Sequence, residues 1–438
     1  MRLDPRRLIG LLSLWLVAAG GLFASAAPSP ASLEKLPVIT TIAYITAHPD
    51  DESGAMIAYF ARGLGARVVL LCLTRGEGGQ NTYGPDLGEE LGRIRTRELE
   101  AAARIYGAEV RFLGALDFGY SKSVEETLER WDEAALVERL VRVLRELKPD
   151  VVIAHWTPEA PAGAHHQAAG IVSRQAYALV GDPAAYPEQQ AAGLAPWPVR
   201  YLVSPARGAD GGENFRVPVE EVDPHTGKSY REIGWEGFRQ HRSQGLDRIP
   251  RGIFRRFRRR SFFHVDALRV AAPLPREARE LVQQLDALPL LFLQVGILPA
   301  WQERLEEVVR LAQAASRNFG ITPAEAAKKL ISGAVLLEAL REELQAASLA
   351  NPEALKVREL VETKQTAFLR AAAALAGIEV TAAADRARVA PGERFRLRLA
   401  LRRGVPEVVE KTGLRVFSFG LSGRADWPRE PVLGEASA

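Results

Sequence analysis

The sequence is poor in cysteine: Cys72 is the only one among 438 residues, so no disulfide can form within the chain. Cys72 stands in an apolar run, 68–73, which suits a small core residue. An excess of charge of one sign is also lacking, and the net charge of +3 does not indicate a nucleic-acid partner for the whole chain. A hydrophobic content of 47% and a charged content of 25% are ordinary for globular protein. The length predicts two or three domains.

The N-terminus has the three parts of a secretory signal. An arginine-containing start precedes an uncharged apolar run, 8–23, and Ala24-Ser25-Ala26 follows as a small-residue cleavage site. An uncleaved anchor is the alternative, because the apolar run nearly reaches spanning length. No cysteine follows the run, so a lipid-anchored form is not expected. We therefore expect residues 1–26 to be a signal peptide and the mature protein to be periplasmic or extracellular.

Strand-like and helix-like segments alternate after this signal. The expected strands are Thr41–Thr46, Arg67–Leu73, Glu109–Leu113, Val151–Ala154 and Arg200–Ser204. The expected helices are Glu52–Leu64, Glu89–Tyr106, Asp132–Leu147 and His165–Leu179. This alternation predicts an α/β fold with a Rossmann-like, mostly parallel sheet and helices on both faces. Right-handed crossovers would bring the carboxyl ends of the strands to one edge, where such sheets bind ligands.

Changes in composition divide the rest of the chain. We expect one domain over 38–275, in which the Gly- and Pro-rich stretch 208–237 predicts a long loop or hairpin. Region 278–377 is rich in Ala, Leu, Glu and Arg and predicts two to four packed helices, with Pro323 and Pro352 near helix starts. Region 378–438 is β-rich and resembles a short or incomplete β-sandwich.

The run 251–260 holds six arginines, five of them within 255–260, with Phe254 and Phe257 among them. We interpret it as a solvated strand or hairpin with its aromatic side chains turned inward. A patch that binds a membrane surface or a polyanion is the alternative, although one local basic run is a weak signal for it.

Titratable groups are concentrated where the first expected strand ends. His48-Pro49-Asp50-Asp51-Glu52 places one imidazole and three carboxylates together. Carboxylates this close repel one another unless a cation lies among them. Capping of the following helix would explain one or two of the acids but not His48. We therefore expect a metal site here.

A hydrolytic zinc ion needs about three protein ligands and one open position. His48 and Asp51 can supply two ligands, and Asp50 can take a proton from the water. The third ligand is expected from the helix after the fourth strand, with His166 as the choice and His165 as the alternative. Adjacent helical residues point about 100° apart, so both histidines are not expected to bind one ion.

A nucleotide site fits the sequence poorly. The first strand ends in acidic residues rather than in a glycine-rich turn, and those carboxylates would repel phosphate. The glycine-rich stretch 76–79 lacks the Gly-Lys-Ser/Thr ending of a P-loop, so we interpret it as a flexible rim of the site.

Five short segments follow one another between about residues 40 and 250. They read AHPDDE from Ala47, LTRGEGGQN from Leu73, LGRIRTREL from Leu91, HQAAG from His166 and HRSQ from His241. In content and order they resemble the PIG-L/LmbE family of zinc-dependent N-acetylglucosaminyl de-N-acetylases. Five ordered segments rarely coincide by chance, so the resemblance is specific.

The resemblance implies a Zn²⁺ cofactor and a small-molecule or glycan substrate. It makes His48, Asp51 and His166 the zinc ligands and Asp50 the general base. It places Arg75 and Arg95 near the substrate, although salt bridges to Glu77 and Glu98 are the structural alternatives. Asn81 and His155 complete the expected substrate contacts. The implied reaction is removal of an acetyl group from an N-acetylated amino sugar or glycoconjugate.

One departure from the family pattern concerns the acid partner. The family usually has a second histidine three positions before the last ligand, where this sequence has Gly163. Its task could pass to His165, His155 or His241, in that order of preference. Asp117, after the third strand, could simply brace its loop. A secreted, catalytically weak glycan-binding protein and a zinc hydrolase of another amide or ester are the alternative functions.

Overall fold

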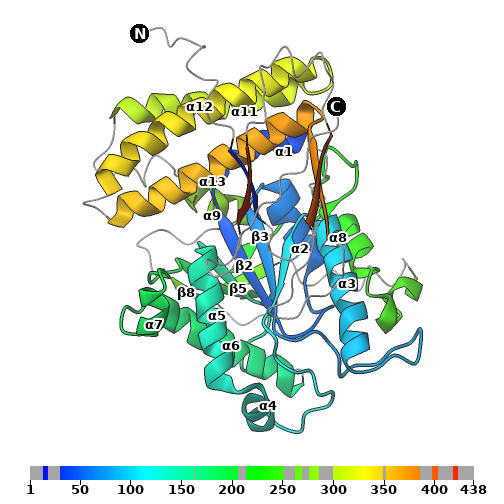
Figure 1. Cartoon of the computed structure of the whole chain (residues 1–438). Helices are drawn as coiled ribbons and strands as arrows, with labels where there is room; N and C mark the ends of the chain where they lie inside the picture. Colours follow the sequence, from blue (N-terminus) through cyan, green and yellow to red (C-terminus); the bar gives the residue numbers. More distant parts are fainter. Residues whose placement is uncertain are drawn as a thin grey trace. The chain divides into compact units, whose positions relative to one another are not determined.

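The chain is represented by a computed structural model (Figure 1). The structure describes residues 13–17, 30–161, 163–205, 214–250, 262–268, 276–285, 299–348, 352–384, 397–402 and 418–422. The basic run 251–260 lies outside the described residues. The chain divides into two compact units, residues 35–298 and residues 1–34 with 299–438.

The described part of unit 35–298 is built on a seven-stranded sheet in the order β4-β3-β2-β5-β6-β8-β7. Its strands are β2 (Thr41–Thr46), β3 (Arg67–Cys72), β4 (Glu109–Phe112), β5 (Val151–Ala154), β6 (Tyr201–Pro205), β7 (Asn214–Arg216) and β8 (Phe262–Leu268). Strands β2 to β6 pair in parallel, and β8 and β7 add two antiparallel strands. The mostly parallel sheet is confirmed, and each expected strand end lies within one residue of the observed one.

Helices cover both faces of this sheet (Figure 1). They are α2 (Gly54–Ala58) with a π-helical continuation (Tyr59–Gly63), α3 (Glu89–Tyr106), α4 (Val124–Trp131), α5 (Glu133–Leu147), α6 (Ala164–Val180), α7 (Pro187–Ala191), α8 (Tyr230–Phe238) and α9 (Ala278–Leu285). Helix α3 has the predicted bounds. Helix α4 is missing from the expected elements, although Ser123 accepts a hydrogen bond from the Glu126 N–H in a Ser-x-x-Glu start that could have indicated it.

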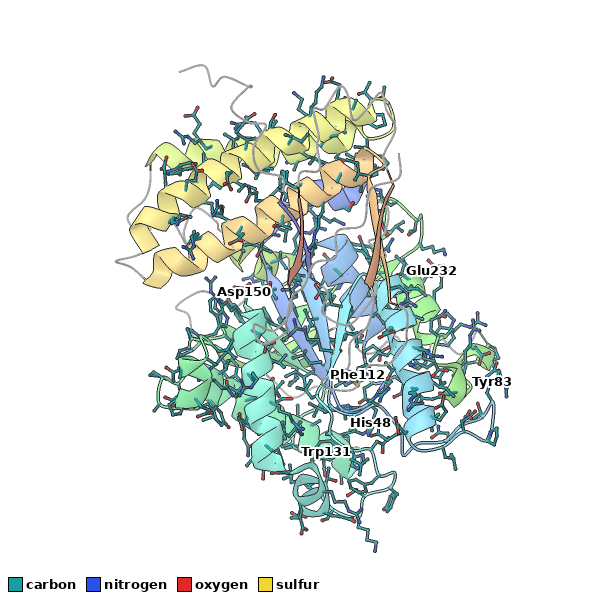
Figure 2. All side chains as sticks on the ribbon, in the orientation of Figure 1. His48, Tyr83, Phe112, Trp131, Asp150 and Glu232 are labelled. Atoms are coloured by element: carbon teal, nitrogen blue, oxygen red, sulfur yellow. The ribbon has the colours of Figure 1, made fainter. Side chains whose placement is uncertain are left out.

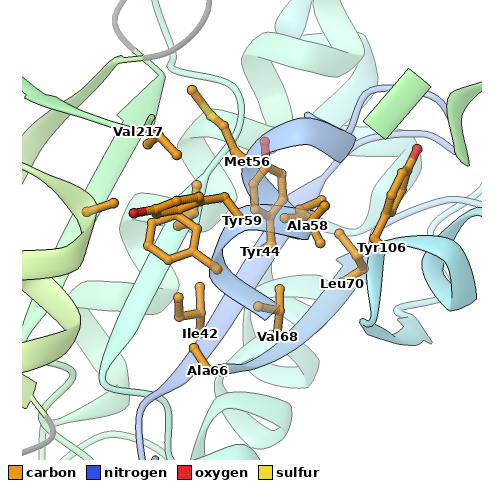
Figure 3. Packing of buried hydrophobic residues seen from close by; sticks show 14 of the residues in the cluster. Ile42, Tyr44, Met56, Ala58, Tyr59, Ala66, Val68, Leu70, Tyr106 and Val217 are labelled. Atoms are coloured by element: carbon orange, nitrogen blue, oxygen red, sulfur yellow. The ribbon is translucent and has the colours of Figure 1, made fainter. Parts of the chain in front are cut away.

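Strand β2 illustrates why the sheet is buried on both faces. Its side chains alternate, so Tyr44 enters one core cluster and Ile45 enters the other. The first cluster includes side chains of α2, α3 and α8 (Figure 3). The second includes side chains of α5 and α6. The two layers fix the sheet so that its strands end along one edge.

The expectation of a loop or hairpin over 208–237 is wrong for its last part. Helix α8 begins there, with a capping box between Ser229 and Glu232. The glycine that favoured a loop serves close packing instead, because a Cβ atom on Gly237 would lie 2.0 Å from the Tyr106 ring. The glycine at this position therefore allows close packing of α8 against α3 and does not indicate an irregular chain.

The second unit is mainly helical in its described part. Its elements are α1 (Pro30–Glu34), α11 (Pro299–Asn318), α12 (Pro323–Ser348), α13 (Pro352–Leu375), an antiparallel pair β9 (Glu379–Ala384) and β10 (Leu397–Arg402), and a parallel pair β1 (Ser13–Val17) and β11 (Ser418–Ser422). Pro323 and Pro352 open their helices, as predicted. Strand β1 falls within the expected signal peptide. Cleavage of that peptide after residue 26 stays a prediction.

Within the described residues, none of the helices combines the length and the apolar character that crossing a membrane requires.

Candidate active site

The loop between β2 and α2 places the acidic motif, 48–52, at the carboxyl end of the sheet. Figure 2 shows His48 and Asp150 at opposite ends of the sheet. The Asp51 carboxylate folds back on its own loop, where Oδ2 accepts hydrogen bonds from the N–H groups of Ala47 (3.1 Å) and His48 (2.8 Å). The carboxylate is therefore oriented by backbone that directly follows a core strand.

His48, Asp51 and His166 converge at this edge. His166 Nε2 lies 3.1 Å from Asp51 Oδ1 and 3.3 Å from His48 Nδ1, and His48 Nδ1 lies 3.6 Å from Asp51 Oδ2. The three residues offer donor atoms that all lie within 4.8 Å of one another. Helix α6 begins just before His166, and the Trp156 ring stacks on the His166 ring with centroids 4.0 Å apart.

The donor set fits a divalent metal ion. Two imidazole nitrogens and one carboxylate oxygen are ligands that zinc accepts in catalytic sites. Burial favours the neutral form of Asp51, but hydrogen bonds from His166 and His48 hold its pKa well below the ordinary value. Burial likewise opposes protonation of His48, but the hydrogen bond and charge of Asp51 prevail and raise its pKa. The Asp51 carboxylate is therefore ionised and can bind a cation at this point.

His165 and His166 lie on opposite sides of the His48 ring. His165 Nδ1 is 3.0 Å from His48 Nε2, the nitrogen that faces away from Asp51, and 3.8 Å from Asp117 Oδ1. Burial and the charge of His48 lower the pKa of His165 to about 4. These three residues form a second group that could hold a metal ion. The geometry agrees with the expectation that the adjacent histidines do not share one ion.

Asp50 stands beside the three converging groups. Its backbone has φ 110°, in a region that residues other than glycine rarely adopt. Burial and the charge of Asp51 raise the pKa of Asp50 to about 7. A cation held by Asp51 would lower that pKa and leave Asp50 ionised, as a base must be.

The glycine-rich stretch after β3 packs around Arg95. A Cβ atom on Gly76 or Gly79 would lie 2.7 Å or 2.6 Å from the Arg95 side chain, so a larger residue at either position would displace that side chain. One Arg95 amino group donates to the Gln80 carbonyl (2.7 Å). Its buried Nε–H has no hydrogen-bond acceptor among the described residues. Burial lowers the pKa of Arg95, and the charges of Asp50 and Asp117 oppose that shift.

Three further predicted substrate contacts have partners within the fold. Arg75 Nε donates to Thr96 Oγ1 (2.9 Å). Asn81 organises its own loop, since its Oδ1 accepts from the Tyr83 N–H (3.0 Å). His155 is buried, and its Nδ1 lies 2.8 Å from the Tyr44 hydroxyl. Their contacts with substrate stay predictions.

His241 is fully buried, and its Nε2 lies 2.8 Å from Glu52 Oε1. Tyr106 donates its hydroxyl to the same oxygen (3.1 Å). Sequence patterns single out Glu52 and His241, but nothing in them indicates Tyr106, the last residue of an amphipathic helix. A structure is needed to see that these three side chains meet.

Comparisons with known proteins identify sequence relatives of this chain. The family described as GlcNAc-PI de-N-acetylase, PIG-L, matches residues 43–177. A 1D-myo-inositol 2-acetamido-2-deoxy-alpha-D-glucopyranoside deacetylase 2 of Frankia casuarinae is 31% identical in an alignment of 236 positions that covers 48% of this chain and 73% of that protein. The corresponding deacetylase of Thermobispora bispora is 36% identical over 163 residues, 33% of this chain and 53% of that protein.

Among solved structures, this chain is similar to the N,N'-diacetylchitobiose deacetylase from Pyrococcus horikoshii. The identity is 20% and the TM-score 0.39, over 52% of this chain and 83% of that one.

The sheet, the acidic loop and the sequence relatives together define an enzyme with an α/β fold that hydrolyses amide carbon–nitrogen bonds. The chain belongs to the GlcNAc-PI de-N-acetylase (PIG-L) family.

Proposed function

We propose that this enzyme removes the acetyl group from an N-acetylglucosamine-type amino sugar or glycoconjugate with the help of zinc. The observation that carries the proposal is the convergence of His48, Asp51 and His166, which would hold the ion. The names of the curated relatives, deacetylases of a 2-acetamido-2-deoxy-glucopyranoside, support the substrate class. The products would be acetate and a free amino sugar.

Zinc bound there supplies Lewis acidity, which lowers the pKa of a water molecule toward about 7 and polarises the acetyl carbonyl. Asp50 accepts the proton that the water loses as it attacks the carbonyl carbon. Asp50 then returns this proton to the leaving amine. We assign the return step to Asp50 because the three histidines expected to replace the missing one, His165, His155 and His241, are buried and each direct one ring nitrogen at another side chain of the fold.

Arg95 is the proposed substrate contact that the structure favours most. Its Nε–H has no acceptor among the described residues, and an unpaired buried donor is costly. A hydroxyl or carbonyl oxygen of the sugar would satisfy it once the glycine-rich stretch 76–79, which covers the Arg95 side chain, moves aside. Arg75 would act farther out, since Thr96 holds its guanidinium.

Asp50→Asn tests the mechanism. Without a carboxylate to accept the proton, acetate release from N-acetylglucosamine derivatives should fall about 10³-fold. Zinc content, measured by elemental analysis, should stay near that of the unaltered protein, because Asp50 is not one of the three ligands. Undiminished acetate release would remove Asp50 as the base.

Gly163 favours a second candidate, a glycan-binding protein of the same fold with little catalysis, because one expected histidine is absent. Tight binding of an N-acetylated sugar without acetate release would support it. A panel of amides and esters separates the sugar deacetylase from a zinc hydrolase of another substrate.

We also propose that the catalytic domain comprises residues 38–275 and that the protein is exported. The first proposal is supported by the compact unit 35–298, within which that range falls. The second is supported by the basic, apolar and small-residue order of the N-terminus. N-terminal sequencing of the secreted protein tests it, with a mature chain that starts after residue 26 as the expected result.

A further inference from the structure

Asp50 is held in a backbone conformation that it would not adopt alone. Its φ of 110° lies outside the regions favoured by a residue with a side chain. Such conformations persist only where the surrounding structure imposes them, and they are frequent at functional sites. The contacts of the Asp50 backbone should therefore reveal what imposes this one.

Glu52 supplies the direct contact. Its Oε2 accepts a hydrogen bond from the Asp50 N–H (3.0 Å). Its other oxygen is fixed by His241 Nε2 at 2.8 Å and by the Tyr106 hydroxyl at 3.1 Å. Both oxygens of this buried carboxylate are thus occupied, and neither is free for a metal or a substrate.

We propose that Glu52, His241 and Tyr106 form a clamp that holds Asp50 in position for the reaction. The three act as positioning residues, because their contact with Asp50 is made to its backbone N–H and not to its carboxylate. The inference rests on the proposed function only in that it takes Asp50 as the base. It also assigns His241 a role other than proton transfer to the substrate.

A second contact from the same segment supports the clamp. Gln244 Nε2 donates to the Pro49 carbonyl (2.9 Å), so the segment His241–Gln244 contacts the loop at both Pro49 and Glu52. Ser243 ties this segment to α3 in turn, since its N–H and its hydroxyl both donate to Glu98 (2.7 Å each). A stretch far along the chain thereby fixes the conformation of the acidic loop.

Two glycines make room for the clamp. A Cβ atom on Gly54 would lie 2.4 Å from the Tyr106 ring, and one on Gly237 would lie 2.0 Å from it. Both helices that flank Tyr106 therefore leave space for its hydroxyl to reach Glu52. Direct proton donation by His241 fits poorly, because the side chain has no exposed surface and its Nε2 already faces Glu52.

The test compares His241→Leu with His241→Gln. Leucine cannot bond to Glu52, so the loop should loosen and kcat should fall about 100-fold, as expected for a small misplacement of a reacting group. KM and zinc content should change less than about twofold, because the metal ligands and Arg95 are untouched. Glutamine can place an amide N–H near Nε2 and should restore kcat to within about tenfold of the unaltered enzyme.

Hydrogen exchange gives a readout that does not need activity. The amide of Asp50 should exchange at least about tenfold faster in His241→Leu than in the unaltered protein or His241→Gln. Thr127→Val is the control, since it removes a buried hydrogen bond from helix α4 to Ser121, outside the clamp, and leaves Glu52 paired. Its kcat and its exchange at Asp50 should stay unchanged.

Two outcomes would overturn the clamp. Equal losses of kcat in both His241 variants would make the imidazole itself catalytic, and unchanged exchange in His241→Leu would show that it does not hold the loop. An unaltered protein that releases no acetate would refute the proposed function instead, and the exchange measurement would still decide on the clamp. Should His241→Leu fail to fold, Tyr106→Phe removes one hydrogen bond to Glu52 and gives both readouts with smaller changes.

Discussion

Two neighbouring acids, Asp51 and Glu52, each meet an imidazole from a distant part of the chain, yet their surroundings differ. The side chains of His48 and His166 around Asp51 are 16% and 22% exposed. The side chains of His241 and Glu52 are 0% and 1% exposed. The same pair of chemical groups can therefore build a site open to a cation in one place and a sealed support in the next.

The hydrogen bonds explain the difference further. Glu52 has both oxygens occupied by groups that cannot leave without an unpaired buried charge. Asp51 spends one oxygen on two backbone N–H groups and directs the other at a partly exposed histidine. Two features therefore distinguish the open cluster, Asp51 with His48 and His166, from the sealed cluster, Glu52 with His241 and Tyr106. The open cluster is accessible to solvent, and one Asp51 oxygen faces a histidine that a metal ion could also bind.

The largest expected effect comes from exchanging each acid for its amide. Asp51→Asn removes a proposed ligand charge and should weaken zinc binding more than about 100-fold, because loss of an outer contact alone costs about 10- to 100-fold. Glu52→Gln should change zinc affinity less than about tenfold, because both Glu52 oxygens are paired with other groups and it belongs to neither ligand cluster. Zinc per chain after dialysis against graded chelator measures both, with the exposed His225→Ala as the control. Equal losses in the two variants would abolish the distinction between the clusters.

A smaller effect is expected from pH. His48 and His241 both have a raised pKa in the folded protein, from partners Asp51 and Glu52 that prevail over burial. Their stabilisation is complete below the ordinary value of 6.5 and is lost as the pH rises through the raised values. Asp50, with its pKa raised to about 7, acts in the same direction. The melting temperature of the metal-free protein should therefore fall as the pH rises above the ordinary imidazole pKa of 6.5.

Zinc should reduce this fall only in part. The ion replaces the proton on His48 but leaves His241 in its sealed pair, so part of the pH dependence should remain. Calorimetry across this pH range, with and without zinc, separates the contribution of His48 to the fall in melting temperature from that of His241. A fall of the same size in both series would contradict the assignment of His48 as a ligand.

The smallest effect is expected from Tyr106→Phe. The change removes one of two bonds to Glu52 Oε1 and should cost about 1 kcal/mol of unfolding free energy. Zinc affinity should not change, since the sealed cluster holds no ligand. Urea unfolding measures the first quantity, and Tyr59→Phe, at another buried tyrosine, serves as a comparison. A loss of zinc in Tyr106→Phe would show that the two clusters are coupled.

The sequence predicted the elements that local rules govern. Alternating runs gave the parallel strands, and the rule that such strands end along one edge indicated that His48, Asp51 and His166 would meet. Their roles as ligands stay predictions. The clamp could not be predicted, because Glu52 and His241 lie 189 positions apart and meet only through the packing of α3 and α8. Gly237 led to a wrong prediction of a loop for the same reason. Its small size is required by the Tyr106 ring, which lies far away in the sequence.

The backbone N–H groups of Ala47 and His48 orient the Asp51 carboxylate through hydrogen bonds that involve no metal ion. The backbone therefore orients this proposed ligand without help from the other two. Exchanging zinc for cobalt should leave the architecture intact, and the coloured ion would then make the coordination sphere visible by absorption spectroscopy.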